Sequence, residues 1–239
     1  MVKLLIVIPA YNEANIIAAN LKKIAEYALA NLQAYDYKII VVDNNSSDLT
    51  GQIVRDLAQL NSKLGYLYLP KKGKGLAVIT AWQKYQDDFD FFSYMDADLA
   101  TDLSCLQPLI SSLEQGYDLA IGSRYARGAK VERSLLRRVF SLAYSLLAQL
   151  ILGVKIKDWP CGFKAITQKV NKEIVPAIKN FTFFFDSELL YLAAKKGFKI
   201  KEIPVIWQEK RDKGGSKINV LKVSWLYIKE MFKLRYRKI

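Results

Sequence analysis

Histidine is missing from the sequence, and this absence removes several common catalytic schemes from the chain. Without an imidazole there is no Ser-His-Asp triad, no Cys-His nucleophile pair and no histidine-based zinc site. Cysteine is scarce too, since Cys105 and Cys161 are the only two. They are too few for a disulfide framework, although one bridge stays open, and such usage is typical of a reducing cytosol. We expect Cys161 to be a small packed residue rather than a nucleophile.

Long apolar runs are also lacking. No stretch reaches about 18 uninterrupted apolar residues, so we predict no helix that spans a membrane. We expect no signal peptide, because the apolar run at residues 4–8 is short and ends at Pro9. Glycine-based nucleotide motifs are missing as well: no G-x-x-x-x-G-K-[ST] is present, and residues 72–76 do not fit G-x-G-x-x-G.

Acidic residues are outnumbered by basic ones. The 23 aspartates and glutamates face 36 lysines and arginines, which gives a net charge of +13 and a pI near 9.5. Most of the excess lies in residues 124–138 and 201–239, whereas the first half of the chain is close to neutral. Such a balance implies an anionic partner, which could be nucleic acid, a phosphorylated ligand or an acidic membrane face.

The chain contains a regular alternation of apolar strands and amphipathic helices. Strands are predicted at residues 3–8, 38–42, 65–69, 89–95 and 118–121. Helices are predicted at residues 14–31, from about 48 to 60, and near 102–114. A further helix is predicted to follow residues 70–75 and to end at about residue 85. This alternation favours an α/β fold with a mostly parallel sheet and helices on both faces. Ligand sites in such folds lie at the carboxyl ends of the strands.

Two carboxylates follow the fourth predicted strand. Asp96 and Asp98 are two positions apart, so in extended chain their side chains fall on the same side. Paired carboxylates at a strand end suit Mg²⁺ or Mn²⁺, which bind one or two carboxylates together with substrate phosphates. The alternative for this pair is a solvated acidic turn.

Two helices depart from the α/β pattern. Residues 134–153 are strongly apolar, with a polar stripe on one face, and are predicted either to pack inside the protein or to lie in a membrane interface. Residues 219–238 predict a basic amphipathic helix, which is either a membrane or partner surface or an ordinary surface helix. Between them, residues 198–207 predict two short strands or one bent strand.

Three motifs at successive strand ends carry a resemblance to a known family. They are Pro9-Ala10-Tyr11-Asn12-Glu13, Asp43-Asn44-Asn45-Ser46-Ser47-Asp48 and Asp96-Ala97-Asp98. In this order and spacing the chain resembles glycosyltransferase family 2, which has the Rossmann-like GT-A nucleotide-sugar fold. We therefore expect one GT-A catalytic domain over residues 1–218, with the apolar helix near 134–153 inserted, and an interface helix over residues 219–239.

Later motifs resemble one subgroup of that family, the polyprenyl-phosphate sugar transferases. These motifs are Gly122-Ser123-Arg124, Arg133-Ser134, Asp158 with Cys161-Gly162-Phe163-Lys164, Phe185-Asp186-Ser187-Glu188-Leu189-Leu190, and Gly215-Ser216-Lys217. The dolichyl-phosphate β-glucosyltransferases look closest. Ala100 stands where the mannosyltransferases often carry glutamine, and Pro160 stands where the family usually has a glutamine amide. No glutamine begins the Q-x-x-R-W motif of processive synthases.

The resemblance implies a donor site and a metal. Its nucleotide-sugar residues would be Pro9, Tyr11, Glu13, Asp43, Lys74, Asp96 and Asp98. Pro9, Tyr11 and Glu13 would wall the base and ribose, and Asp43 would accept hydrogen bonds from the base. Asp98 would ligate Mg²⁺ or Mn²⁺ on the diphosphate, with Asp96 assisting the metal or contacting the ribose. The metal would neutralise charge on the leaving nucleotide.

The implied acceptor is dolichyl or polyprenyl phosphate, an anion that needs no strong general base. Its phosphate would be held by Arg124, Arg133, Ser134 and Lys217. Asp98, Arg124, Arg133 and Asp158 are the candidate catalytic residues. In-line attack at the anomeric carbon would invert configuration and give a β-linked lipid-phosphate sugar.

Several of these residues have structural alternatives. Asp43 could serve only as a turn or cap residue, and Asp158 could hold its loop without touching substrate. Asp186 and Glu188 could be buried carboxylates that orient basic residues. Arg137 and Arg138 are expected to face membrane or solvent rather than substrate.

The predicted function is inverting transfer of a hexose, with glucose from UDP-glucose favoured, onto dolichyl or polyprenyl phosphate. A GDP-mannose-dependent mannosyltransferase is the alternative within the class. A basic nucleic-acid-binding α/β module is the alternative outside it, disfavoured by the strand-end carboxylates and by the lack of RRM, KH or helix-turn-helix patterns. We expect a peripheral, monotopic protein on the cytoplasmic face of a membrane, with no nucleic-acid partner and homo-oligomerisation left open.

Overall fold

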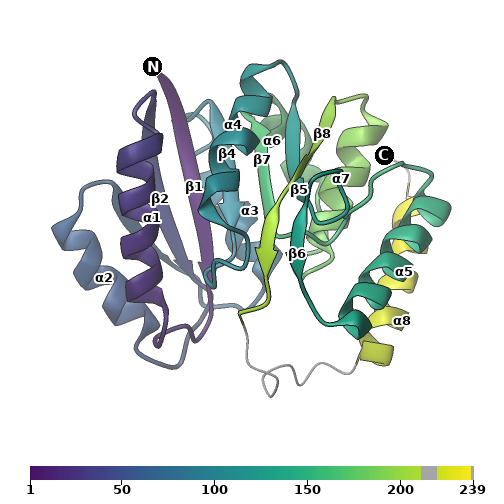
Figure 1. Cartoon of the computed structure of the whole chain (residues 1–239), viewed down its shortest axis with the longest axis horizontal. Helices are drawn as coiled ribbons and strands as arrows, with labels where there is room; N and C mark the ends of the chain where they lie inside the picture. Colours follow the sequence, from purple (N-terminus) through teal and green to yellow (C-terminus); the bar gives the residue numbers. More distant parts are fainter. Residues whose placement is uncertain (211–219, 238–239) are drawn as a thin grey trace.

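A computed structural model describes residues 1–210 and 220–237, with side chains in the last segment from residue 226 onward. Its centre is a seven-stranded sheet in the order β3-β2-β1-β4-β7-β5-β8 (Figure 1). The strands are β1 Val2–Ala10, β2 Tyr35–Asp43, β3 Leu64–Tyr68, β4 Phe91–Met95, β5 Leu119–Ser123, β7 Phe163–Thr167 and β8 Ile200–Pro204. All neighbours are parallel except β7, which is antiparallel to β4 and β5. The mostly parallel α/β fold is confirmed.

Alternating side chains of the strands build a core on each face of the sheet. On β1, Leu4, Ile6 and Ile8 enter one cluster of buried apolar residues, whereas Leu5 and Val7 enter the other. This period of two is what an extended strand buried on both faces requires.

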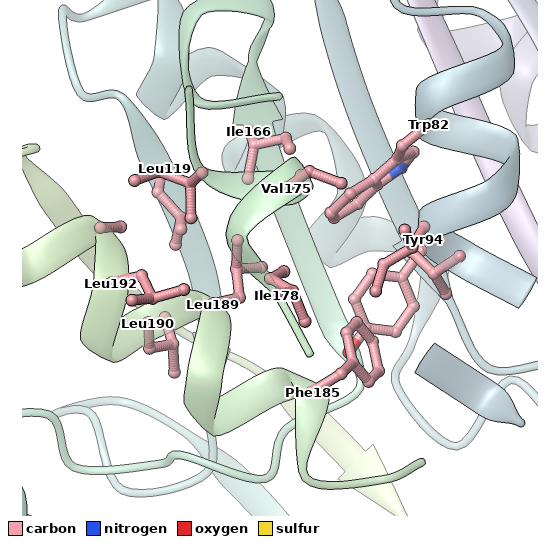
Figure 2. Packing of buried hydrophobic residues seen from close by; sticks show 14 of the residues in the cluster. Trp82, Tyr94, Leu119, Ile166, Val175, Ile178, Phe185, Leu189, Leu190 and Leu192 are labelled. Carbon is pink, nitrogen blue, oxygen red and sulfur yellow. The ribbon is translucent and has the colours of Figure 1, made fainter. Parts of the chain in front are cut away.

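Helices cover both of these faces (Figure 1). One face carries α1 Ile17–Asn31, α2 Thr50–Leu60 and α4 Leu106–Glu114, which follows the short 3-10 helix η1 Leu103–Cys105. The other carries α3 Lys74–Lys84, α6 Gln168–Ile174, the 3-10 helix η2 Val175–Ala177 and α7 Phe185–Lys195. Figure 2 shows this second core, where Trp82 from α3 and Phe185 from α7 lie beside Tyr94 of β4.

Two features of the sheet were not predicted from the sequence. β7 lies between β4 and β5, with Met95 paired to Phe163, so the chain enters β7 at the edge where β4 ends. The residues just before β7 therefore sit beside the Asp96–Asp98 turn. A small parallel pair, β6 Lys130–Glu132 with β9 Ile206–Gln208, extends from the same edge. β8 and β9 confirm the pair of short strands expected near residues 198–207.

The apolar helix α5, Leu135–Leu152, lies outside the sheet next to α8, Val220–Arg235 (Figure 1). Its small polar residues face the protein: Ser141 and Ser145 are buried. Most of its large apolar residues face outward, with Leu152 buried at its end; the exposed ones are Leu135, Leu136, Val139, Phe140, Leu142, Leu146, Leu147 and Leu150. Such an arrangement is the reverse of an ordinary surface helix.

By length and composition alone, α5 qualifies as a membrane-crossing helix, the one that does so in the described part of the chain. The sequence prediction of no such helix required uninterrupted apolar residues. It passed over α5 because Arg137, Arg138 and three further polar residues interrupt the run.

Candidate active site

A cleft of about 550 Å³ opens where β1 and β4 end side by side. The strand order reverses between these two strands, and ligands of open α/β sheets bind at such switch points. Loops after β1, β2, β3 and β4 meet there, together with residues just before α7. The cleft is lined by Pro9, Ala10, Tyr11, Glu13, Asn44, Lys72, Gly73, Lys74, Asp96, Ala97, Asp98, Thr182 and Phe183.

A salt bridge between Lys74 and Asp96 lies at the inner end of this cleft. The Nζ atom of Lys74 is 2.6 Å from Oδ1 of Asp96, and the lysine side chain is mostly buried. Burial alone would lower the pKa of Lys74, but the carboxylates of Asp96, Asp186 and Asp98 outweigh it and raise that pKa. Lys74 is therefore a firmly protonated cation, which suits contact with a phosphate group.

The turn after β4 fixes the second carboxylate. Oδ1 of Asp98 accepts a hydrogen bond from the amide of Ala100, 3.0 Å away, and the amide of Leu99 bonds to the Asp96 carbonyl. Leu99 has a φ of 51°, an uncommon conformation for a branched non-glycine residue. Its buried side chain keeps it there. Backbone strain of this kind is often found at ligand sites.

Asp96 and Asp98 fit a hard divalent cation that takes its other ligands from a substrate. Among the described residues no cluster of three or more acidic or cysteine side chains could hold a metal by itself. Mg²⁺ and Mn²⁺ commonly bind through one or two carboxylates, with phosphate oxygens and water completing the shell. The donor set is thus suitable for an ion that arrives with a diphosphate.

Gly162 brings the loop before β7 against this carboxylate. A Cβ atom at position 162 would lie 2.4 Å from Oδ2 of Asp96 and 2.7 Å from Nζ of Lys74. A Cβ atom there would push the ends of these two side chains aside, so glycine at this position leaves the Lys74–Asp96 pair in place.

On the far side of the same carboxylates lies a smaller pocket of about 110 Å³. Asp96 and Asp98 line both cavities, and Arg124 and Trp207 are the principal new side chains in the second. Its lining is Met95, Asp96, Asp98, Leu99, Ala100, Thr101, Arg124, Pro160, Cys161, Gly162 and Trp207.

Asp158 holds Arg124 in place. The Nε and Nη2 atoms of Arg124 donate to the two oxygens of Asp158 at 2.8 and 2.7 Å, and the Arg124 amide donates as well. Both side chains are almost fully buried. Burial would lower the pKa of Arg124, but the Asp158 carboxylate more than compensates, and the pKa rises. Asp158 thus orients the arginine and is not in the lining of either cavity.

Arg133 and Arg124 both contact the ring of Trp207. The guanidinium carbons of Arg124 and Arg133 are 5.6 and 5.3 Å from the Trp207 ring centroid. Arg133 also donates to Oγ of Ser141 at 2.8 Å. Burial and the positive charge of Arg124 lower its pKa. Its Nε atom is buried and has no hydrogen-bond partner within the described residues.

A buried ion pair holds the loop that precedes β7. The fully buried ammonium of Lys164 is 2.6 Å from Oδ1 of Asp186 and also donates to the carbonyls of Trp159 and Cys161. Tyr94 donates its hydroxyl to the same carboxylate, so the pKa of the tyrosine is raised by burial and by Asp186. Asp186 is therefore a buried carboxylate that orients a basic residue, which matches the structural alternative given for it.

Asp43 lies behind the cleft instead of lining it. Its oxygens accept from the amide of Ser46 and from the hydroxyl of Tyr66, both at 2.9 Å, and it is nearly fully buried. Burial and hydrogen bonding to Asp43 raise the pKa of Tyr66 to about 12. The geometry matches the turn role weighed for Asp43, and Asn44 takes the place in the lining.

The remaining candidates are placed as follows. Ser134 precedes the first residue of α5 and its amide donates to Glu209, while Arg137 pairs with the same glutamate. Lys217 lies outside the described residues. Cys161 is buried, which raises its pKa to about 12 and fits a packed residue.

The lining residues that were not predicted as site residues include Asn44, Lys72, Thr182, Phe183 and Trp207. Asn44 belongs to the motif of residues 43–48, so the sequence does carry a signal for it. Thr182 and Phe183 immediately precede the Phe185-to-Leu190 motif, whereas Trp207 carries no local signal because its role depends on distant arginines.

The comparisons with known proteins agree with this geometry. The family model described as "Glycosyl transferase family 2" matches residues 5–175. Glycosyltransferase AglD of Haloferax volcanii is 32% identical over 88% of this chain, which spans 34% of that protein. A dolichyl-phosphate beta-glucosyltransferase of Dictyostelium discoideum is 30% identical over 97% of the chain and 73% of its own length. A dolichol-phosphate mannosyltransferase of Pyrococcus furiosus is also 30% identical, over 97% of the chain and 63% of its own length.

Solved structures share the fold at low identity. Glucosyl-3-phosphoglycerate synthase from Mycobacterium tuberculosis, in complex with Mn²⁺, UDP and phosphoglyceric acid, matches with a TM-score of 0.70 at 17% identity over 99% of this chain and 80% of that one. Mannosyltransferase PcManGT from Pyrobaculum calidifontis, with GDP-Man and Mn²⁺, matches with a TM-score of 0.59 at 19% identity over 89% and 58%. These likenesses establish the GT-A fold.

The contact at Gly162 generates a test. We expect Gly162→Ala to weaken Mn²⁺ binding at least about tenfold, because the added methyl displaces Asp96 from its pair with Lys74. Titration of Mn²⁺ by electron paramagnetic resonance, with a nucleoside diphosphate present, measures this. Gly65→Ala is the matched control, since its Cβ would press only on the movable terminal methyl of Ile40 on strand β2. Equal Mn²⁺ affinity in all three proteins would contradict the placement of the cation.

Proposed function

Because this chain belongs to glycosyl transferase family 2, we propose that it transfers a hexose from a nucleotide sugar to a polyprenyl phosphate such as dolichyl phosphate. Glucose from UDP-glucose is the donor we favour. The observation that carries the proposal is the position of Asp96 and Asp98 between two cavities, the larger beside Lys74 and the smaller beside Arg124. Two anionic substrates can then meet at one pair of carboxylates.

The donor nucleotide is assigned to the larger cleft. Tyr11 is partly exposed there, and its ring and hydroxyl contact the ammonium of Lys72, which offers a flat surface and a charge to a nucleoside. Lys74 would bind a phosphate oxygen of the diphosphate. Asp98, with Asp96, would hold Mg²⁺ or Mn²⁺, which when bound neutralises charge on the leaving nucleoside diphosphate.

The acceptor phosphate is assigned to the smaller pocket and to Arg133 beside it. A phosphate monoester is ionised near neutral pH, so it attacks without a general base, consistent with a chain that lacks histidine. Asp158 holds Arg124 in the lining of this pocket, and Arg133 lies against the Trp207 ring that also lines it, so two guanidinium groups flank the place of the phosphate. Attack from this side, opposite the diphosphate, would invert the anomeric configuration.

The donor sugar is favoured by sequence features rather than by a contact. Dolichyl-phosphate beta-glucosyltransferases of Dictyostelium discoideum and Saccharomyces cerevisiae are both 30% identical to this chain. Ala100 and Pro160, which both line the smaller pocket, stand where mannosyltransferases or the wider family carry glutamine. The Pyrococcus furiosus mannosyltransferase is equally similar, so transfer of mannose from GDP-mannose is the second candidate.

The outward face of α5 supports a place at a membrane surface. Its exposed leucines, including Leu146 and Leu150, form a continuous apolar side on a helix otherwise pinned to the protein by Ser141 and Tyr144. A polyprenyl acceptor stays in the bilayer, so insertion of this face would bring the smaller pocket to its substrate. We propose a peripheral protein on the cytoplasmic side, with α5 and α8 in the interface.

The reaction is tested directly with a donor panel. We expect the protein with Mg²⁺ or Mn²⁺ and a short polyprenyl phosphate to transfer label from UDP-glucose to lipid. Asp98→Ala should reduce transfer at least about a hundredfold, because the charge of the leaving diphosphate is no longer neutralised. Asp87→Ala is the control, an exposed carboxylate paired with Lys172 before β4, at the opposite edge of the sheet.

Each outcome of the panel is decisive. Transfer from GDP-mannose alone would replace glucose by mannose in the proposal. Transfer from no donor, or full activity of Asp98→Ala, would overturn the reaction itself.

The acceptor site predicts a selective kinetic defect. We expect Arg133→Gln to raise the KM for polyprenyl phosphate about tenfold or more while leaving the KM for the nucleotide sugar unchanged, since one phosphate-binding cation is lost. Arg127→Gln, an exposed arginine nearby in the chain, is the matched control. A rise in the donor KM alone would show that the two substrates are assigned to the wrong cavities.

Membrane attachment is tested by vesicle flotation. We expect the double variant Leu146→Glu, Leu150→Glu to lose most of its binding to phosphatidylcholine vesicles that contain phosphatidylglycerol, because two charges oppose burial of the α5 face. Leu29→Glu, on the exposed side of α1, should float as the wild type does. Unchanged flotation of the double variant would remove α5 from the interface.

A further inference from the structure

One wall of the nucleotide cleft is built by a short stretch that runs from η2 into the first turn of α7. This stretch, residues 177–188, is called here the wall segment. Thr182 and Phe183 line the cleft, and Ile178 anchors the other end in the buried cluster of Figure 2. The segment therefore connects the cleft to the residues that contact it on its outer side.

The wall segment is locked to the helix that carries Lys74. The amide of Leu76, in the first turn of α3, donates to the Phe181 carbonyl at 3.0 Å. A Cβ at Gly73 would lie 2.6 Å from that same carbonyl, and a Cβ at Gly75 would lie 2.8 Å from the Thr182 carbonyl. Backbone therefore packs against backbone with no space between, so a shift of the segment must move the first turn of α3.

From the outside the segment is held by Glu188. This carboxylate is buried, and its two oxygens accept from the amides of Lys179 and Asn180 at 3.0 and 2.8 Å. Arg237, just beyond α8, pairs with Glu188 and also donates to the Ala177 carbonyl at 2.9 Å. One guanidinium thus neutralises the charge that fixes the start of the segment.

A second contact joins α8 to the same stretch. The Tyr227 ring of α8 lies 5.9 Å from the Phe184 ring and 5.4 Å from that of Tyr144 on α5. The Tyr144 hydroxyl in turn hydrogen-bonds with Ser187 at 2.6 Å. Both α5 and α8 are consequently seated on the segment that walls the cleft.

We propose that the wall segment couples the α5–α8 pair to the nucleotide cleft, with Arg237 as a positioning residue that acts through Glu188 on Phe183 and Lys74. This inference rests on the proposed function, since it takes the ligand of the cleft to be a nucleoside diphosphate. Loss of Arg237 leaves a buried carboxylate without its counter-charge. The segment then relaxes toward water, and the cleft loses the placement of both side chains.

The experiment measures nucleotide binding by the full chain, apart from any transfer reaction. UDP and GDP with Mn²⁺ are titrated by calorimetry into the wild type, Arg237→Gln, Arg237→Lys and Lys233→Gln. We expect Arg237→Gln to bind the preferred nucleotide roughly five- to tenfold more weakly, a typical size for coupling between two sites. Arg237→Lys should recover part of that loss. Lys233→Gln, which alters only an exposed pair with Glu230, should bind as the wild type.

A thermal unfolding curve accompanies each variant. If Arg237→Gln unfolds earlier yet binds nucleotide normally, Arg237 is merely an anchor of α8 and the inference is overturned. Wild-type protein that binds neither UDP nor GDP would overturn the proposed function, and the inference with it. Tyr227→Leu, which keeps apolar bulk but removes the ring contact, gives a second arm if Arg237→Gln fails to fold. Its unchanged affinity would then reject the coupling.

Discussion

The buried pair between Lys164 and Asp186 is the interaction on which the site depends. The ammonium group is fully buried and binds two backbone carbonyls of the loop before β7 together with the carboxylate. That loop is the one that presses Gly162 against Asp96. Buried ion pairs seldom add net stability over a well-packed apolar core, so its value here is one of position. The Lys164–Asp186 pair thus fixes the distance between Asp96 and the loop before β7.

The reversed direction of β7 explains how the second half of the chain reaches the same edge as the first. In an all-parallel sheet the residues before a strand lie at the edge opposite the ligands. Because β7 is antiparallel to β4, its first residue Phe163 pairs with Met95, the last residue of β4. Asp158 and Gly162 are thereby delivered to the carboxyl edge, where Asp158 orients Arg124. One inverted strand thus brings residues from both halves of the chain to the same edge of the sheet.

Sequence patterns were sufficient for the parts of the fold that repeat. Apolar runs ending in polar motifs located β1 to β5. Tyr11, Lys74, Asp96 and Asp98, which the family resemblance implied for the donor site, line one cleft. β7 was missed because Phe163–Thr167 is short and shows neither a strong strand period nor turn residues at both ends. The partners of Asp158 and Glu188 could not be predicted, since each pair joins residues more than thirty positions apart. Local sequence patterns do not reveal contacts between residues so far apart in the chain.

The orientation of α5 shows what periodicity leaves undecided. A stripe of serines on a leucine-rich helix indicates two different faces, but the same pattern fits a helix with the stripe turned outward or inward. In the structure the stripe faces inward: Arg133 donates to Ser141, and the neighbouring Tyr144 hydroxyl hydrogen-bonds with Ser187. The leucines lie on the outer side, and contact with an apolar medium would remove the free-energy cost of exposing them to water. Polar contacts with Arg133 and with Ser187 of the wall segment therefore hold this side of the helix against the protein, and they connect the exposed apolar side to the edge of the sheet that carries the candidate site.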